Sequence, residues 1–314
     1  MKMKKIATLL IAMAAVLSMT ACGSGSSSAA SSASKTASSS SSTSSSTSSG
    51  SSSGSSFTVS DSDPTTTIMI AHSSGENTVL NRACLKYKEL AEKYSNGKIT
   101  VEVYPNGTLM SVAEMNEAIK DGTVQIIAGS PGAQLSTALG IFELPNLVSS
   151  VEQAHKIMQP GQDFRTILDG LFENEGVKLQ CIEPCDFRML TSNKEIKSYS
   201  DIAGLKIRVM DSTVPMSYWK QWGASPTPLA WSEVYMSLQQ GMVEAQENPY
   251  DSIIAANLQE VQKYIIDTKH VMFYTGFMMN EAYYNSLPSN YQALLDQVAK
   301  EVAAYTYQDA QDSS

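Results

Sequence analysis

The chain has 314 residues, and 31 acidic side chains outnumber 22 basic ones, so the net charge is −9 at neutral pH. This length is sufficient for two domains of ordinary size. An acidic chain without basic clusters excludes nucleic acid or an anionic membrane surface as its main partner. If the protein binds an anion, it must concentrate positive charge at one place in its fold.

The N-terminal segment has the pattern of an exported lipoprotein. Three lysines precede an apolar run at Ile6–Leu17, and Cys22 follows that run. The run is shorter than the roughly 20 residues that a membrane-spanning helix needs. We therefore expect a signal peptide at residues 1–21 and lipidation of Cys22, which would anchor the protein to the cell membrane. The serine-rich stretch at 22–63 has no apolar face to bury and predicts a disordered tether.

The next part of the chain alternates between strand and helix patterns. Apolar stripes predict helices at Val79–Tyr94 and Val112–Ile119. Strands are expected at Thr67–Ala71, Ile99–Val103 and Val124–Ala128. This alternation is typical of a parallel sheet with crossover helices, which binds ligands at the carboxyl ends of its strands. We expect the loops after Ala71 and Ala128 to face a ligand cleft.

A later stretch, from Gly204 to Pro249, carries a cation and an aromatic side chain on regular elements. Lys206–Val209 alternates like a half-buried strand and holds Arg208 on a rigid element. Ser232 is a candidate N-cap and Gly241 a stop signal for the helix that follows. The apolar stripe of that helix has the spacing i, i+3, i+4 and i+7: Trp231, Val234, Tyr235 and Leu238.

The end of this stretch contributes an amide. Val243–Glu247 predicts a short strand, and Asn248 follows as a candidate N-cap with Pro249 at the first helical position. An anion is favoured at such a helix N-terminus, so the Asn248 side chain is a second candidate contact for an acidic ligand.

Three sequence runs stand together here: RMLTSNKEIKSYSDIAGLKIRV, GASPTPLAWSEVYMSLQQG and QENP. In order and spacing they resemble the DctP family, the solute-binding proteins of tripartite ATP-independent periplasmic (TRAP) transporters, and the resemblance extends from Thr65 to the end of the chain. It implies an α/β, two-domain periplasmic-binding-protein-like fold with a hinge and an inter-domain ligand cleft. It also implies an extracytoplasmic, non-catalytic receptor without a cofactor, which delivers an organic acid to membrane permease subunits.

The resemblance also predicts how the chain is divided. Domain 1 would comprise 64–186 and 273–314, and domain 2 would comprise 187–272. Val151–Phe172 is expected to form helical cover over domain 1. A strand from Val177 would cross to domain 2 near Asp186, and Phe273–Met279 would return to domain 1. Two connecting strands of this kind predict a hinge.

By resemblance, a substrate carboxylate is held by Arg188, Arg208 and Asn248, with Trp231 as the aromatic residue beside it. A planar guanidinium matches a carboxylate bidentately, so arginine is suited to this role. Each residue also has an ordinary alternative role. The arginines could form ion pairs, Asn248 could only cap a helix, and Trp231 could belong to the core.

The acidic neighbours in sequence that could form an ion pair with Arg188 are Asp186 and Asp201.

The three cysteines after Cys22 are an odd number, which favours free buried thiols: Cys84, Cys181 and Cys185. A disulfide bridge between Cys181 and Cys185 stays open. The histidines are too far apart for a metal-ligand spacing and are expected to be structural: His72, His155 and His270.

The sequence alone does not decide the class of the ligand, and it leaves two rival functions. Sialic-acid-binding relatives carry charged residues about where Gly129 and Gly132 stand, so a smaller acid is expected, such as a hexuronate, an aldonate or a short-chain carboxylate. A tethered hydrolase is one rival, although the segment around Ser130 lacks the first glycine of a nucleophile elbow. A sensor that binds the same acid for signalling is the other.

The last predicted helix begins after Pro288 and has no glycine or proline before Ser314 to end it. In the family this helix continues, and further helices follow it. The sequence therefore predicts a chain truncated at its C-terminus, with an apolar face of domain 2 left uncovered.

Overall fold

The structure is a computed structural model that describes residues 57–313. The expected signal peptide, Cys22 and most of the expected tether lie outside these residues. Within the described range, no helix combines the length and the apolarity needed to cross a membrane.

Five strands form a first sheet in the order β2-β1-β3-β10-β4. β1 is parallel to β2 and β3, whereas β10 is antiparallel to both of its neighbours. The parallel part follows from the alternation of strands and helices in the sequence. The bounds are β1 Thr66–Ala71, β2 Ile99–Tyr104, β3 Ile126–Gly129, β4 Val177–Phe187 and β10 Met272–Asn280.

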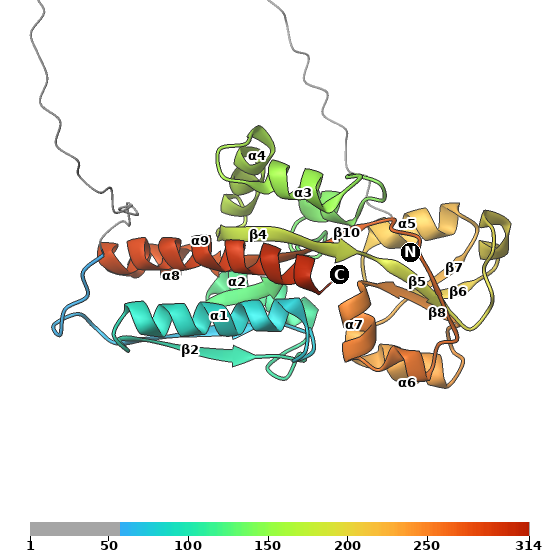
Figure 1. Ribbon diagram of the computed structural model, residues 1–314, viewed down its shortest axis with the longest axis horizontal. Helices are drawn as coiled ribbons and strands as arrows, with labels where there is room; N and C mark the ends of the chain where they lie inside the picture. Colours follow the sequence, from blue (N-terminus) through green and yellow to red (C-terminus); the bar gives the residue numbers. More distant parts are fainter. Residues whose placement is uncertain (1–56, 314) are drawn as a thin grey trace, which may run out of the picture. The chain divides into compact units, whose positions relative to one another are not determined.

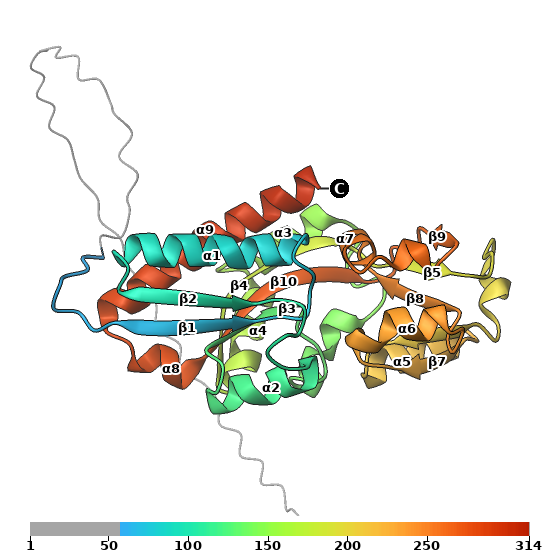
Figure 2. The same cartoon turned by 90° about the horizontal axis from the view of Figure 1, so that it is seen from below.

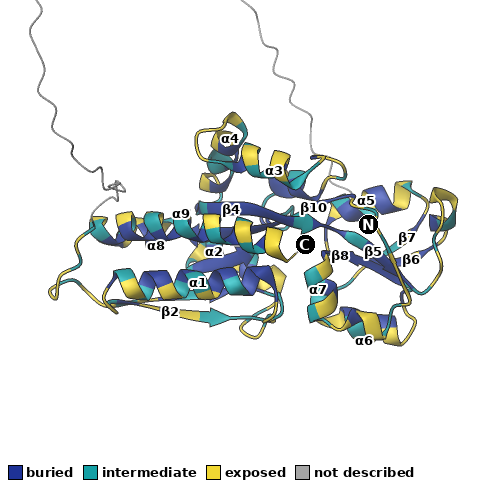
Figure 3. Ribbon diagram, viewed as in Figure 1, coloured by how far each residue is buried: buried dark blue, intermediate teal, exposed yellow. Residues whose placement is uncertain are grey.

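Helices cover both faces of this sheet, and we call the assembly the first lobe (Figures 1 and 3). Side chains alternate between the faces along β10, so Phe277 and Met279 belong to one core and Met278 to the other. The first core lies under α1 and α9, which run side by side, and the second lies under α2, α3 and α4. The bounds are α1 Val79–Tyr94, α2 Val112–Asp121, α3 Val151–Met158, α4 Asp163–Glu173, α8 Glu281–Ser286 and α9 Ser289–Asp312.

A second five-stranded sheet has the order β7-β6-β8-β5-β9 and, with its helices, forms the second lobe. Trp219 of α5 and Ile207 of β6 are fully buried in its main core. Its bounds are β5 Met189–Ser192, β6 Lys206–Val209, α5 Thr213–Gln221, β7 Ser225–Pro228, α6 Val234–Gln239, β8 Ala245–Asn248, α7 Tyr250–Ala255 and β9 Tyr264–Ile266.

The chain passes between the two sheets at two places. β4 leads into β5 with Arg188 alone between them, and residues 267–271 connect β9 to β10 (Figure 2). β4 and β10 are paired up to the register Met272↔Phe187, so both connections begin at the same end of the first sheet. Such a short, paired connection suits a hinge between two lobes.

The expectations at Ser232 and at the end of the tether were wrong. Ser232 does not cap a helix, because Trp231–Glu233 forms a 3-10 turn, and the Glu233 carboxylate accepts a hydrogen bond from the backbone N–H of Ala230 at 3.1 Å. The tether was expected to reach Asp63, but the described end of that segment is packed on the first lobe. The Phe57 ring lies 5.6 Å from that of Tyr94, because an aromatic side chain gains from burial even after a serine-rich stretch.

Candidate functional site

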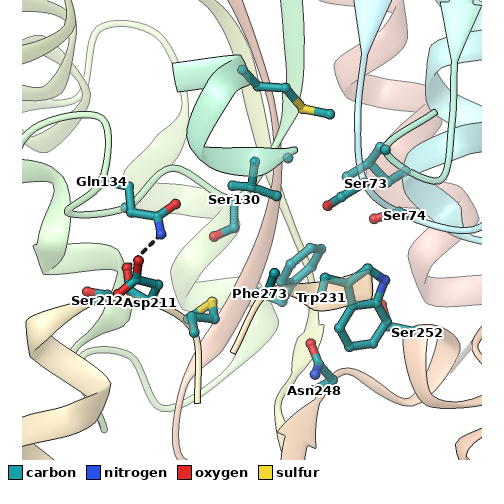
Figure 4. Close-up of a pocket in the computed structure, with 18 of the residues that line it drawn as sticks. Ser73, Ser74, Ser130, Gln134, Asp211, Ser212, Trp231, Asn248, Ser252 and Phe273 are labelled. Carbon is teal, nitrogen blue, oxygen red and sulfur yellow. Dashed lines mark hydrogen bonds between the residues drawn. The ribbon is translucent and has the colours of Figure 1, made fainter. Parts of the chain in front are cut away.

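A cavity of about 440 Å³ is lined by residues from both lobes (Figure 4). The first lobe contributes the loop after β1, including Ser73 and Ser74, and the loop after β3, including Ser130. These loops follow the carboxyl ends of parallel strands, as the sequence predicted. The second lobe contributes the residues singled out by the sequence: Arg188, Arg208, Trp231 and Asn248.

Arg208 is placed on the cavity wall by β6, whose bounds match the strand expected from the sequence. Its side chain is buried, with 3% of the residue exposed. Nε and Nη2 donate to the backbone carbonyl of Leu229 at 3.0 and 2.8 Å, and Nη1 has no hydrogen-bond partner among the described residues. Burial lowers the pKa of Arg208 to about 10, although the charge of Glu247 opposes the shift.

Arg188 is equally buried but has a carboxylate partner. Its Nε donates to Oε2 of Glu247, while Nη2 donates to Oε1 of Glu247 at 2.9 Å and to Oδ1 of Asn248 at 3.0 Å. Burial is the largest single influence and lowers the pKa of Arg188, but the charge and hydrogen bonds of Glu247, together with Tyr218 and Glu143, outweigh it and the net shift is upward. Its ion-pair partner is thus neither Asp186 nor Asp201.

Glu247, which sequence reasoning missed, is the counterion of the site. It is fully buried. Burial raises the pKa of Glu247, yet Arg188 and His270 outweigh burial and lower it to about 2. The antiparallel register of β5 and β8, which pairs Met189 with Asn248, brings this carboxylate to Arg188 from 59 residues away in sequence.

Asn248 does not cap a helix, which corrects the expectation from the sequence. It is the last residue of β8, and Pro249 occupies the N-cap position of α7 with an extended backbone. Because the backbone stays extended for one more residue, the Asn248 side chain points to the cavity wall instead of to the helix. Nδ2 donates to Oε1 of Gln246 at 2.6 Å, and its second N–H has no hydrogen-bond partner among the described residues.

Trp231 lies at the cavity beside Arg208. The Arg208 guanidinium carbon is 5.7 Å from the centre of the Trp231 ring, which is within cation–π range. Trp231 is also packed against the small core of α6, so a structural role and a cavity role coexist. Figure 4 shows its indole on the same side of the cavity as Ser252, with Asn248 and Phe273 nearby.

Most of the remaining cavity wall is neutral. Among the described lining residues, the charged side chains are two cations, Arg188 and Arg208, and two anions, Glu143 and Asp211. Hydroxyl and amide groups supply the other polar contacts, and no sequence pattern marked most of them. They are Ser73, Ser74, Asn106, Ser111, Asn116, Ser130, Gln134, Ser212, Ser232 and Ser252.

The cysteines and histidines take structural positions. The three described cysteines are free and buried, so no bridge joins Cys181 and Cys185. Within residues 57–313 no cluster of histidine, cysteine and carboxylate side chains is suited to a metal ion. His72 contacts Asn81 at 3.1 Å, and His155 contacts Glu183 at 2.6 Å.

Residues 70–314 match the family model of the bacterial extracellular solute-binding proteins of family 7, DctP. The chain belongs to this family. A protein similar to it, the C4-dicarboxylate-binding periplasmic protein DctP of Rhodobacter capsulatus, is 31% identical over 243 residues, which cover 76% of this chain and 72% of that protein. The comparison confirms the family indicated by the three sequence runs.

Solved structures extend the likeness to the fold. A TRAP periplasmic solute-binding protein from Roseobacter denitrificans with bound L-galactonate has a TM-score of 0.76 and 28% identity, covering 80% of this chain and 84% of that one. Another, from Shewanella oneidensis with bound succinate, has a TM-score of 0.74 and 27% identity, covering 80% and 82%. The chain is therefore a TRAP-type extracytoplasmic solute-binding protein with a two-domain fold and a ligand cleft, and it is not an enzyme.

Proposed function

We propose that this protein captures a small hydroxylated organic acid in the cleft and delivers it to the membrane permease subunits of a TRAP transporter. Arg208 binds the carboxylate, Arg188 and Asn248 complete its hydrogen bonds, and Trp231 packs against the carbon chain. Two domains, 64–186 with 273–314 and 187–272, close over the ligand. Lipidated Cys22 holds the receptor at the outer face of the cell membrane.

The observation that carries this proposal is the unpaired charge of Arg208. A buried cation is costly unless an anion accompanies it. Within residues 57–313, Arg208 faces the cavity with only a backbone carbonyl and an aromatic ring as partners, whereas the neighbouring Arg188 has Glu247. A ligand carboxylate at Nη1 of Arg208 would supply the missing negative charge.

The charge count of the wall favours one carboxylate over two. Glu247 neutralises Arg188, and Glu143 and Asp211 add negative charge to the same wall, so among the described lining residues only Arg208 is a cation without a paired carboxylate. The hydroxyl and amide side chains on the facing lobe, such as Ser130 and Gln134, suit the hydroxyl groups of an aldonate or hexuronate better than a second carboxylate. The relative with bound L-galactonate supports this class, and the relative with bound succinate represents the competing one.

A thermal-shift screen of aldonates, hexuronates and C4-dicarboxylates tests the proposal. A ligand at 100 times its dissociation constant stabilises the folded protein by about 2.7 kcal/mol. We expect the largest increase in melting temperature from a hydroxylated monocarboxylate and no increase in Arg208→Ala. Arg82→Ala, which removes an arginine paired with Asp309 outside the cavity wall, should keep the wild-type response. If no acid stabilises the wild type, or if Arg208→Ala responds equally, the proposal is wrong.

A further inference from the structure

Glu143 and Ser212 join the two lobes across the cavity wall. Glu143 is the last residue of the 3-10 helix Thr137–Glu143. This helix is packed on the first lobe, because the ring of Phe142 lies edge-on to the ring of Tyr274 in β10, with 5.1 Å between the ring centres. Ser212 is the N-cap of α5 in the second lobe. Its hydroxyl donates to Oε2 of Glu143, and both residues are buried. Separation of the lobes must break this hydrogen bond.

The first lobe holds the Glu143 carboxylate from its other side. Oε1 accepts a hydrogen bond from the backbone N–H of Ala133 at 3.0 Å. A Cβ atom at Gly132 would lie 2.2 Å from Oε1, so only glycine leaves space for this arrangement. Gly140 gives a similar close approach, because its Cβ would lie 3.1 Å from Cγ2 of Val214 in α5. Gly132 therefore leaves space for the carboxylate within the first lobe, and Gly140 allows α5 of the second lobe to approach at this point.

The electrostatics make this contact sensitive to closure. Glu143 has no cation within ion-pair distance among the described residues, and burial raises its pKa while the hydrogen bonds from Ser212 and Ala133 partly offset the rise. In an open cleft, water would solvate the carboxylate. In the closed cleft, the Ser212 hydroxyl is the donor that the second lobe provides in place of water.

The lobes are also in contact at other points around the cavity. Next to it, Nε2 of Gln134 donates to the backbone carbonyl of Asp211 at 2.6 Å. Figure 4 shows this pair and Ser212 on one side of the cavity, with Ser73, Ser74 and Ser252 on the other. On that other side, the backbone N–H of Val79 donates to Asp251 at 3.2 Å.

We propose that Glu143 and Ser212 form a clasp that holds the cleft closed and so sets the rate of ligand release, with no direct contact to the carboxylate of the ligand. They are positioning residues. The inference rests on the proposed function, since it assumes a ligand that is trapped by closure. Its first test, however, needs no ligand.

Hydrogen exchange of the ligand-free protein tests the clasp across the lobes. Ser212→Ala changes the second lobe, yet we expect the Ala133 amide in the first lobe to exchange about tenfold faster, because the clasp no longer holds the lobes together. Ser212→Thr keeps the hydroxyl and should restore wild-type exchange. The control Ser150→Ala removes an N-cap of the same kind from α3 and should leave the Ala133 amide unchanged. Unchanged exchange at Ala133 in Ser212→Ala would overturn the clasp.

Ligand kinetics provide the second test, with L-galactonate as the probe. Glu143→Ala and Ser212→Ala should each accelerate dissociation by about tenfold or more, the effect of losing a hydrogen bond to a charged group, with a smaller change in the association rate. The double variant should be no worse than Glu143→Ala, since both changes remove one contact. Equal dissociation rates in wild type and both single variants would contradict the clasp.

The two proposals fail in different ways. If the wild type binds neither L-galactonate nor any acid of the screen, the proposed function fails, and hydrogen exchange alone decides the clasp. If Arg208→Ala abolishes binding while Ser212→Ala changes neither the dissociation rate nor exchange at Ala133, the function stands and the clasp is wrong. Melting temperatures of the variants show whether any of them has lost its fold.

Discussion

Arg188 and Arg208 lie on one cavity wall and are equally buried, each 3% exposed, but the groups that surround their charges differ. Arg188 has a carboxylate partner, and Glu247 raises its pKa. Arg208 has the carbonyl of Leu229 and the ring of Trp231, and burial lowers its pKa to about 10. One arginine is thus paired with a carboxylate of the fold, while the other has no carboxylate partner among the described residues.

The difference fits the proposal that Arg208, and not Arg188, binds the carboxylate of the ligand. A fully paired site would gain little from a ligand carboxylate, because the incoming anion would compete with the internal one. Without Glu247, both Arg188 and Arg208 would be buried arginines without a paired carboxylate, which is costly. The observed arrangement pairs Arg188 with Glu247 and gives Arg208 no carboxylate partner among the described residues.

The largest effect should come from removing the Glu247 carboxylate, the partner of Arg188. Glu247→Ala leaves Arg188 buried and unpaired, so we expect a loss of about 3–5 kcal/mol in the free energy of unfolding. Urea denaturation measures it. Glu195→Ala, which removes a surface partner of Lys197, should cost less than about 1 kcal/mol. A Glu247→Ala variant as stable as this control would show that Arg188 does not depend on its partner.

Removal of the other cation should affect binding instead of folding. Arg208→Ala should weaken binding of the acid by more than about a hundredfold, or roughly 3 kcal/mol, because a desolvated carboxylate loses its counterion. Arg208→Lys should also bind poorly, since a point charge cannot replace the planar fork. Calorimetry measures the affinities. Binding close to that of the wild type in Arg208→Ala would reverse the roles assigned to the two arginines.

The aromatic neighbour of Arg208 gives a smaller effect. Trp231→Ala should weaken binding about tenfold, or by roughly 1–2 kcal/mol, through lost contact with the ligand and a less fixed guanidinium. Trp231→Phe should retain most of the affinity. In an Arg208→Ala background the same substitution should matter less, because part of its effect acts through Arg208. Equal losses in both backgrounds would mean that the two side chains act independently.

The smallest expected effect is the pH dependence of the free energy of unfolding that Glu247 causes, which should be visible only at acid pH. The folded-state pKa of Glu247 is about 2, below its ordinary value of 4.5, so its contribution to stability is complete above pH 4.5. It is lost as the pH falls from 4.5 through about 2. Stability differences between wild type and Glu247→Gln should therefore be constant from pH 6 to 8 and shrink toward pH 3. A difference that does not shrink would exclude ionised Glu247 as the cause.

Much of the fold followed from local patterns in the sequence. The strand Lys206–Val209 and the helix Val79–Tyr94 have the predicted bounds, because alternation and a continuous apolar stripe specify these elements without help from distant residues. The loops after β1 and β3 line the cavity, as the strand-end rule for parallel sheets predicts. The four candidate residues reach one cavity, although their contacts with a ligand stay a prediction.

The missed features depend on contacts between distant segments or on small differences in backbone geometry. Glu247 meets Arg188 through the β5–β8 register, which no local pattern specifies. Glu143 meets Ser212 only because two lobes approach each other. Asn-Pro was interpreted as a helix cap, but an extended Pro249 moves the cap by one residue and turns Asn248 into a strand end.

A crystal structure of the protein with L-galactonate tests the central claim most directly. We predict the ligand carboxylate within hydrogen-bond distance, about 2.7–3.0 Å, of Nη1 of Arg208, with Arg188 still paired to Glu247. The hydroxyl groups of the ligand should face the serine-bearing loops of the first lobe. A bound ligand whose carboxylate lies away from Arg208, with that guanidinium still bonded only to the carbonyl of Leu229, would contradict the account.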